Sequence, residues 1–151
     1  MSAHQDGDAP RIVVGVDGSA ASRAAFRWAV RQAELTGATI QAITAWQHPV
    51  ATGGYAWGPV GVLDSTDLQE AAEKTLADEI SEVVGARTDI KLQPQPVEGN
   101  PAQVLLDASA GADLLVVGSR GHGGFTGMLL GSVSEHCVSN AHCPVLVLRQ
   151  N

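Results

Sequence analysis

Short apolar runs alternate with longer segments of helical periodicity along the whole of this 151-residue chain. The first run, 11–16, is rich in the β-branched residues of a buried strand. Alanines then recur every fourth position from Ala21 to Ala33, which is the spacing of one helix face. Strands and helices in this order predict an α/β fold: an open, doubly wound, five-stranded parallel sheet with helices on both faces. The later strands are expected at 38–46, 89–97, 112–117 and 144–148, and the later helices near 66–84, 100–111 and 132–140.

Capping residues predict several helix ends. Ser19 is expected to cap the first helix, and Gly37 to end it. A capping box formed by Thr66 and Gln69 is expected at the start of the second helix. The third helix is expected to start at Asn100, with Pro101 in the first helical position.

Prolines mark the third expected strand as an edge strand. Pro94 and Pro96 have no backbone N–H, so this run cannot donate hydrogen bonds on both sides as a central strand does. In doubly wound sheets, ligands bind beyond the carboxyl ends of the strands, where the winding reverses. The turn that starts at Asp17 and the loop that starts at Gly118 follow two different strands and are both expected at that edge. Two separate loops therefore indicate one binding place.

Charge and hydropathy argue against several classes of protein. The chain has 9 Lys and Arg against 16 Asp and Glu, a net charge of −7, which disfavours nucleic acids and anionic membranes as partners. No apolar stretch approaches the roughly 20 residues of a membrane span, and the acidic N-terminus lacks a signal-peptide pattern. We expect a disordered tail over 1–10, a single domain over 11–151, a cytoplasmic location, and reduced thiols at Cys137 and Cys143.

A glycine-rich segment follows the fourth apolar run. Residues 118–132 read G-S-R-G-H-G-G-F-T-G-M-L-L-G-S and contain six glycines ahead of a helical segment that opens on Ser132, a residue suited to capping. A strand, a glycine-rich loop and a helix start bring bare backbone N–H groups and the positive end of a helix dipole together. The chain has no G-x-x-x-x-G-K-[ST] motif, and its first strand is not followed by G-x-G-x-x-G. The pattern predicts that backbone amides, rather than a lysine, bind a phosphate group.

Four separated motifs carry a family resemblance. They are V-V-G-V-D-G-S from Val13, L-L-V-V-G-S-R-G from Leu114, L-L-G-S-V-S from Leu129 and C-P-V-L-V-L from Cys143. Together, over residues 12–148, they resemble the universal stress protein family and its ATP-binding branch. The resemblance implies a Rossmann-like, adenine nucleotide alpha hydrolase-like sheet of strand order 3-2-1-4-5. It also implies a nucleotide-dependent regulator or sensor in the stress response that holds ATP, or AMP or ADP, with Mg²⁺ accompanying ATP.

The resemblance also implies the site residues and the assembly. Asp17 would contact adenine and ribose, with Val16 beside it, while the backbone of Ala45 would meet adenine and Gly118 the ribose. The positions implied for the phosphates are Gly121, Gly131, Ser132, Val133 and Ser134, the last through its hydroxyl. A homodimer that pairs through the C-terminal strand 145–148 is implied as well.

Several functions stay open for this site. A weak ATP hydrolase would have to use Arg120, His122 or Asp17, because neither loop contains a lysine, and no residue is assigned a catalytic role. A protein that binds AMP or a cyclic nucleotide is a second candidate, and a ligand-free interaction module is a third. Arg120 either pairs with a phosphate or is solvated, and Trp46 either stacks on adenine or packs in the core.

Two further groups of residues are weighed against packing roles. His136, Cys137, His142 and Cys143 are a legitimate set of zinc ligands. However, the first two are adjacent in a helix and point roughly 100° apart, so core packing of one cysteine is favoured and no metal site is predicted. In the loop 47–63, Tyr55 and Trp57 either cover a ligand or pack on the surface.

Overall fold

The computed structural model describes residues 9–48, 64–119 and 130–149. Most of the expected N-terminal tail, the loop with Tyr55 and Trp57, and the middle of the glycine-rich segment lie outside these described residues. Within the described ranges, no helix is both long enough and apolar enough to cross a membrane.

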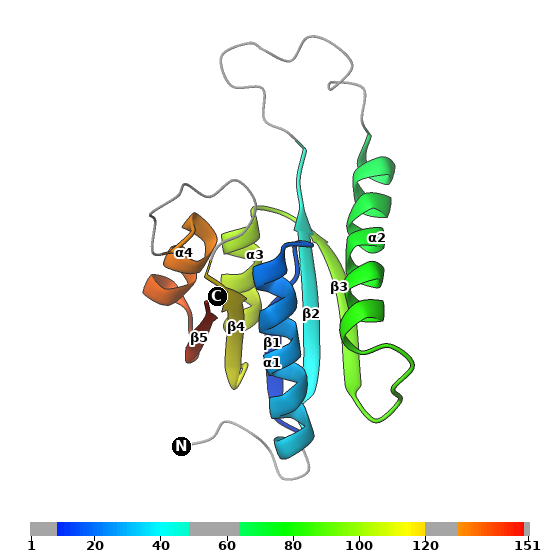
Figure 1. Cartoon of the computed structure of the whole chain (residues 1–151). Helices are drawn as coiled ribbons and strands as arrows, with labels where there is room; N and C mark the ends of the chain where they lie inside the picture. The colour runs from blue at the N-terminus through cyan, green and yellow to red at the C-terminus, as the bar shows by residue number, and fades with distance from the viewer. Residues whose placement is uncertain (1–8, 49–63, 120–129, 150–151) are drawn as a thin grey trace.

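Five parallel strands form one sheet in the order β3-β2-β1-β4-β5, as the sequence predicted (Figure 1). The proline-containing strand lies at one edge, where Pro94 and Pro96 stand opposite Ala42 and Thr44 of the neighbouring strand. The expected strand ends differ from the observed ones by one or two residues. The strands are β1 (Arg11–Gly15), β2 (Thr39–Trp46), β3 (Lys91–Glu98), β4 (Leu114–Gly118) and β5 (Val145–Leu148).

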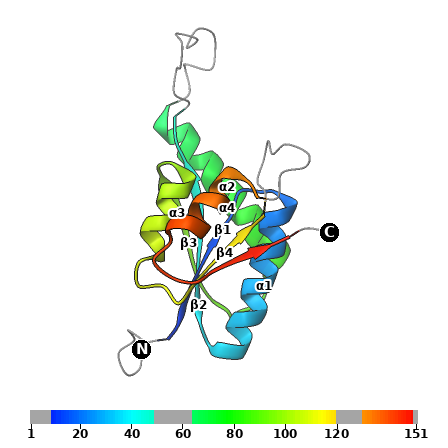
Figure 2. The ribbon, with the colours of Figure 1, turned by 90° about the vertical axis from the view of Figure 1, so that its left-hand side faces the viewer.

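Helices cover both faces of the sheet, which confirms the doubly wound architecture. The helices are α1 (Ala20–Thr36), α2 (Ser65–Val83), α3 (Pro101–Ser109) and α4 (Ser132–Asn140). Helices α3 and α4 lie together on one face and α1 lies on the other (Figure 2). Side chains alternate along the strands, so Val14 faces a core with Phe26 of α1, whereas Val13 faces a core with Leu105 of α3.

Local sequence explains where α1 and α3 begin and where α1 ends. The Ser19 side chain accepts a hydrogen bond from the Ser22 amide, and Gly37 ends the helix with a φ of 75°, a conformation that favours glycine. Asn100 caps α3, and Pro101 takes the first helical position, where its missing N–H costs nothing. These starts and this stop agree with the sequence prediction.

The capping residues of the other two helices were predicted incorrectly. The box expected at Thr66 and Gln69 does not cap α2, because Asp64 does so by accepting from the Asp67 amide. Aspartate is an equally good cap, and its charge also favours the positive end of the helix. In α4, Ser132 is the first helical residue and Gly131 holds the cap position, so no side chain caps this helix.

Helix α1 crosses the end of β4 at very short range. A Cβ atom placed on Gly118 would stand 2.7 Å from the Cβ of Ala21, and 2.8 and 2.9 Å from the carbonyl carbon and oxygen of that residue. Real Cβ atoms do not approach other heavy atoms so closely. Gly118 is therefore required by the packing of the first turn of α1 against the sheet.

We expect Gly118→Ala to lower the free energy of unfolding by about 1–3 kcal/mol, the usual cost of overpacking a well-packed site. Urea denaturation followed by circular dichroism measures this change. Adding Ala21→Gly should recover only part of the loss, because the carbonyl carbon and oxygen of residue 21 remain in the way. An alanine variant as stable as the original chain would contradict this account of the contact.

Candidate functional site

The winding of the sheet reverses between β1 and β4, which pair with each other in parallel. After β1 the chain returns to form β2 on one side, and after β4 it returns to form β5 on the other. Both chain segments stay attached to the sheet as they leave it. The Val16 amide donates to the carbonyl of Ile43 over 2.8 Å, and the Ser119 amide donates to the carbonyl of Leu148 over 2.7 Å. The two loops predicted to form a site therefore begin side by side.

The carbonyl of Ser119 fixes the start of α4 at this edge. It accepts from the Gly131 amide over 2.6 Å and from the Ser134 hydroxyl over 2.9 Å. Ser134 is 2% exposed, so its hydroxyl belongs to this internal contact, and only its amide is left for the phosphate role assigned from the resemblance. The same contact brings the first turn of α4 next to the end of β4.

The first turn of α4 presents backbone amides that no side chain in the described part of the chain caps. In a helix that begins at Ser132, the amides of Ser132 and Val133 have no partner four residues earlier within the helix. Such amides lie at the positive end of the helix dipole and favour an anion. Ser132 itself is exposed, and Val133 is half-buried.

The Asp17 turn uses its backbone amides differently. The amide of Asp17 donates to the Ser22 hydroxyl over 3.3 Å, and the amide of Gly18 donates to a carboxylate oxygen of Glu79 over 3.2 Å. Asp17 is exposed, and its Oδ1 accepts from the Ser19 amide over 2.9 Å. This bond forms an Asx turn, a local structure that needs no ligand. What this turn offers at the sheet edge is a carboxylate rather than amides.

Sequence reasoning did not identify Glu79 as part of this region. Glu79 is 3% exposed, and its two carboxylate oxygens lie 2.8 and 3.0 Å from the Ser22 hydroxyl oxygen. The signal was present, because position 79 follows the buried Ala72 and Leu76 by seven and three residues, and so lies on the apolar face of α2. A charged residue at such a position has to find a partner in the interior.

Burial raises the pKa of the Glu79 carboxyl above its ordinary value of 4.5. The hydrogen bonds from Ser22 and Gly18 act in the opposite direction. The charge of Asp17 raises the pKa further, and the charge of Arg23 lowers it. The buried carboxyl is therefore hydrogen-bonded but remains costly to ionise.

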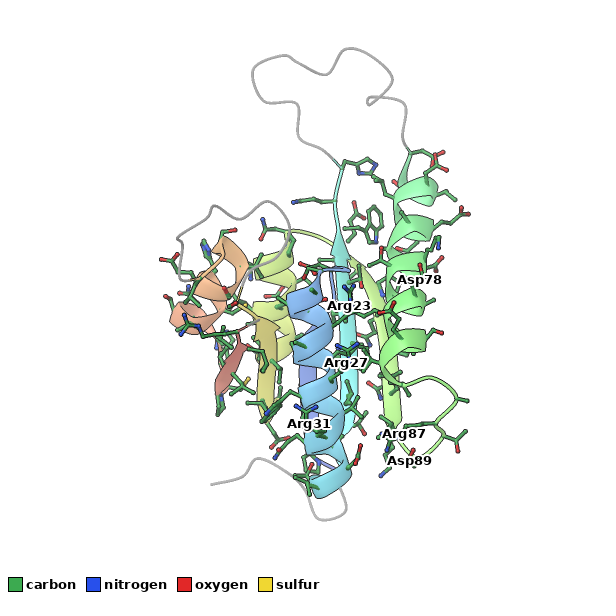
Figure 3. All side chains as sticks on the ribbon, viewed as in Figure 1. Arg23, Arg27, Arg31, Asp78, Arg87 and Asp89 are labelled. Carbon is green, nitrogen blue, oxygen red and sulfur yellow. The ribbon has the colours of Figure 1, made fainter. Side chains whose placement is uncertain are left out.

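Three arginines follow one another along α1, and the first of them contacts the acidic helix α2. Arg23, Arg27 and Arg31 follow one another at four-residue spacing (Figure 3). The guanidinium of Arg23 donates to the Gly18 carbonyl over 2.8 Å and pairs with Glu82 at 3.4 Å. Arg23, which contacts the Asp17 turn, therefore has two partners inside the protein.

The end of β2 contains the remaining expected residues. Ala45 is half-buried against the core on the side of α3 and α4, while Trp46 belongs to the opposite face by strand alternation. The rings of Trp46 and His48 meet edge to face with their centroids 6.1 Å apart. Among the described residues, Trp46 Nε1 and Thr44 Oγ1 are buried without a hydrogen-bond partner.

In the segment that contains both cysteines, Cys137 packs in the protein core. Cys137 is fully buried, and burial raises the pKa of its thiol to about 11. In the part of the chain that the structure describes, no three His, Cys, Asp or Glu side chains come together as metal ligands. Arg120, Gly121 and His122 lie outside the described residues.

The fold and this edge define a class: a doubly wound, Rossmann-like α/β protein with an uncapped helix start at the point where the winding reverses. The model of the universal stress protein family matches residues 9–149, so the chain belongs to that family.

Relatives and solved structures agree with the family assignment. The chain is 36% identical over 140 residues to universal stress protein Rv2005c of Mycobacterium tuberculosis, which covers 93% of this chain and 45% of the relative. The chain thus spans about half the length of the curated relatives it matches. The fold is similar to universal stress protein UspA from Lactobacillus plantarum, with 25% identity, a TM-score of 0.77, and coverage of 95% of this chain and 99% of that one. A universal stress protein crystallised in complex with cAMP is also similar, with 25% identity, a TM-score of 0.68 and the same coverage.

We expect the stability of Glu79→Gln to depend less on pH than that of the original chain. A carboxyl with a raised pKa binds its proton more readily in the folded state, so its contribution to the free energy of unfolding falls as pH rises above about 4.5. Denaturation at a series of pH values should show the stability of the glutamine variant rising relative to that of the original chain as the pH increases above about 4.5. A difference that stays constant over this range would show that burial does not perturb this group.

Proposed function

We propose that the chain binds an adenine nucleotide across the edge between β1 and β4 and acts as a nucleotide-dependent regulator in the stress response. The observation that carries this proposal is the pairing of two unlike groups: uncapped amides at the start of α4 and a carboxylate at Asp17. A nucleotide has two parts that complement these groups: an anionic phosphate, and a ribose whose hydroxyls donate hydrogen bonds. The cAMP complex of a similar family member supports the same ligand class.

The phosphates are assigned to the start of α4. The amides of Ser132 and Val133, with that of Ser134 behind them, are the donors, and the helix dipole adds to their attraction for an anion. Gly131 has φ −75° and ψ 170°, a conformation open to every residue. Its lack of a side chain is therefore better explained by close approach of a ligand than by backbone geometry. Gly121 and Arg120 belong to the proposal as loop contacts.

The nucleoside is assigned to the other side of the edge. The Asp17 carboxylate accepts from a ribose hydroxyl, and Val16 and the backbone of Ala45 contact adenine. Gly118 is assigned to the ribose through its backbone, because the space beside its Cα is taken by Ala21 of α1. The parallel register of β1 and β4, in which Val14 stands opposite Val116, brings Val16 level with Gly118.

ATP with Mg²⁺ is the ligand we propose, with AMP or a cyclic nucleotide as the alternative. Mg²⁺ is commonly held by one or two protein groups while phosphates and water complete its shell. The exposed hydroxyl of Ser132, at the helix start assigned to the phosphates, fits such an ion when it arrives with the nucleotide.

Regulation is favoured over hydrolysis because Arg23 is already paired and neither lysine of the chain lies at this edge of the sheet. Phosphoryl transfer needs positive charge on the leaving group and a group that orients water. Arg23 is engaged with Gly18 and Glu82, Lys74 pairs with Asp78 on the exposed side of α2, and Lys91 begins β3 at the opposite end of the sheet. Slow turnover of ATP remains the second candidate.

We also propose a homodimer through β5. All four residues of this edge strand are half-buried, and an apolar edge strand favours pairing with another copy.

The ligand can be identified from the purified protein. Heat denaturation followed by anion-exchange chromatography of the supernatant should release ATP, with AMP or a cyclic nucleotide marking the alternative. ADP that accumulates with time would favour the hydrolase. A protein that releases no nucleotide and gives no heat with any adenine nucleotide in calorimetry would refute the proposal.

Gly131→Val should abolish nucleotide binding, because a branched side chain at the helix entrance keeps the phosphates from the amides of Ser132 and Val133. Loss of two charge-assisted hydrogen bonds corresponds to a rise in Kd of more than about 100-fold. Isothermal titration calorimetry measures this, and Gly131→Ala should give an intermediate loss. Unchanged affinity in a correctly folded valine variant would show that the phosphates bind elsewhere.

Asp17→Ala should weaken binding of adenosine nucleotides by ~1.5–3 kcal/mol, or roughly 10- to 150-fold in Kd, the usual value of a hydrogen bond to a charged group. Asp17→Asn separates the two roles of this side chain, because it keeps the acceptor for the Ser19 amide but removes the charge. Asp107→Asn on the exposed side of α3 is the charge-matched control. If Asp17 and Asp107 variants bind alike, Asp17 does not touch the nucleoside.

A further inference from the structure

A carboxylate from α2 lies beneath the Asp17 turn, far from it in sequence and without any assigned role. We propose that Glu79 is the positioning residue that holds this turn in its nucleotide-binding conformation and couples α2 to the occupancy of the site. The inference rests on the proposed function.

The contacts of Glu79 converge on the backbone of the turn. One oxygen accepts from the Gly18 amide at 3.2 Å and from the Ser22 hydroxyl at 2.8 Å. The Ser22 oxygen in turn accepts from the Asp17 amide at 3.3 Å. One side chain therefore orders two consecutive amides of the turn, one directly and one through serine.

The conformation of the Asp17 turn needs stabilisation by residues outside the turn. Gly18 has a φ of 83°, a conformation that glycine reaches easily and leaves as easily, so the residue does not fix its own geometry. The local bond from the Ser19 amide uses Oδ1 of Asp17, the same carboxylate that is assigned to the ribose. When a ligand competes for that carboxylate, the bonds from Glu79 and Ser22 still hold the turn.

Glu79 also occupies a position that packing alone would fill with an apolar residue. It continues the stripe of Ala72 and Leu76 on α2, and burying a carboxylate there is costly. The charged groups that face it are Asp17 in the turn and Arg23 on α1, of opposite sign. A costly group at the proposed site, which accepts from the Gly18 amide and the Ser22 hydroxyl, is explained by a positioning role.

The link makes α2 part of the site. Arg23 adds a second connection, because it joins the Gly18 carbonyl to Glu82 one turn further along α2. Coupling between two places is reciprocal. If α2 holds the turn for the nucleotide, the bound nucleotide must also stabilise α2.

Three variants test the proposal by calorimetry with ATP and with AMP. Glu79→Ala should weaken binding about tenfold, because it removes the hydrogen bonds that order the turn. Glu79→Gln should bind within about twofold of the original chain, because its amide oxygen accepts from Gly18 and its amide nitrogen donates to Ser22. Asp78→Asn, the same loss of charge on the adjacent exposed residue, should leave binding unchanged.

Ser22→Ala is a milder second variant for the case that Glu79→Ala does not fold. It keeps the bond between Gly18 and Glu79 but removes the one to the Asp17 amide, and should give an intermediate loss of affinity. The expected order of affinity is Glu79→Gln close to the original chain, then Ser22→Ala, then Glu79→Ala. A different order would overturn the proposal, as would equal affinity of Glu79→Ala and the original chain.

Amide hydrogen exchange separates this proposal from the function it rests on. In the protein without nucleotide, the Gly18 amide should exchange faster in Glu79→Ala than in the original chain and return to the slow rate in Glu79→Gln. If the original chain gives no heat when titrated with ATP or AMP, the proposed function is refuted. The exchange rates of the Gly18 amide would still decide whether Glu79 positions the turn. With nucleotide bound, α2 should exchange more slowly in the original chain; no change there would overturn the coupling.

Discussion

The parallel pairing of β1 with β4 is the constraint on which this structure depends. Because the chain leaves these two neighbours in opposite directions, the segments that follow them must part at the carboxyl edge of the sheet. Ser119 then fixes one side of that parting by accepting from Gly131 and Ser134. Gly118 fixes the other, since only a residue without a side chain lets α1 approach so closely.

The backbone amides on the two sides of this sheet edge differ in their hydrogen bonding. In the Asp17 turn, the amides of Asp17 and Gly18 point inward to Ser22 and Glu79. At the start of α4, no side chain of the described residues caps the first amides. A buried carboxylate thus lies behind the acidic side, and a helix dipole behind the amide side. This polarity explains how an acidic protein could hold an anion without a cluster of lysines.

Much of the fold followed from local chemistry, and less of the site did. Pro94 and Pro96 predicted the edge strand because a missing N–H acts regardless of context, and Ser19 and Gly37 predicted the ends of α1 for similar reasons. The start of α2 was missed because Asp64 and Thr66 are both good caps, and packing chose between them. Glu79 was missed because its meaning depends on Gly18 and Ser22, which are 61 and 57 residues away in the chain. The sequence predicted that the candidate residues lie at the carboxyl edge of the sheet, and those that the structure describes lie there. The internal hydrogen bond of the Ser134 hydroxyl could be found only from the three-dimensional structure.

The narrow gap between Gly118 and Ala21 has a consequence for enzyme engineering. A designer who wished to turn this scaffold into an efficient hydrolase would want a lysine close to the reacting group, and position 118 is the obvious choice by location. Any side chain there would push the first helix off the sheet, so catalytic equipment would have to be grafted onto the flanking loops instead. Steric clearance, more than chemistry, therefore limits which reactions this architecture can acquire at its centre.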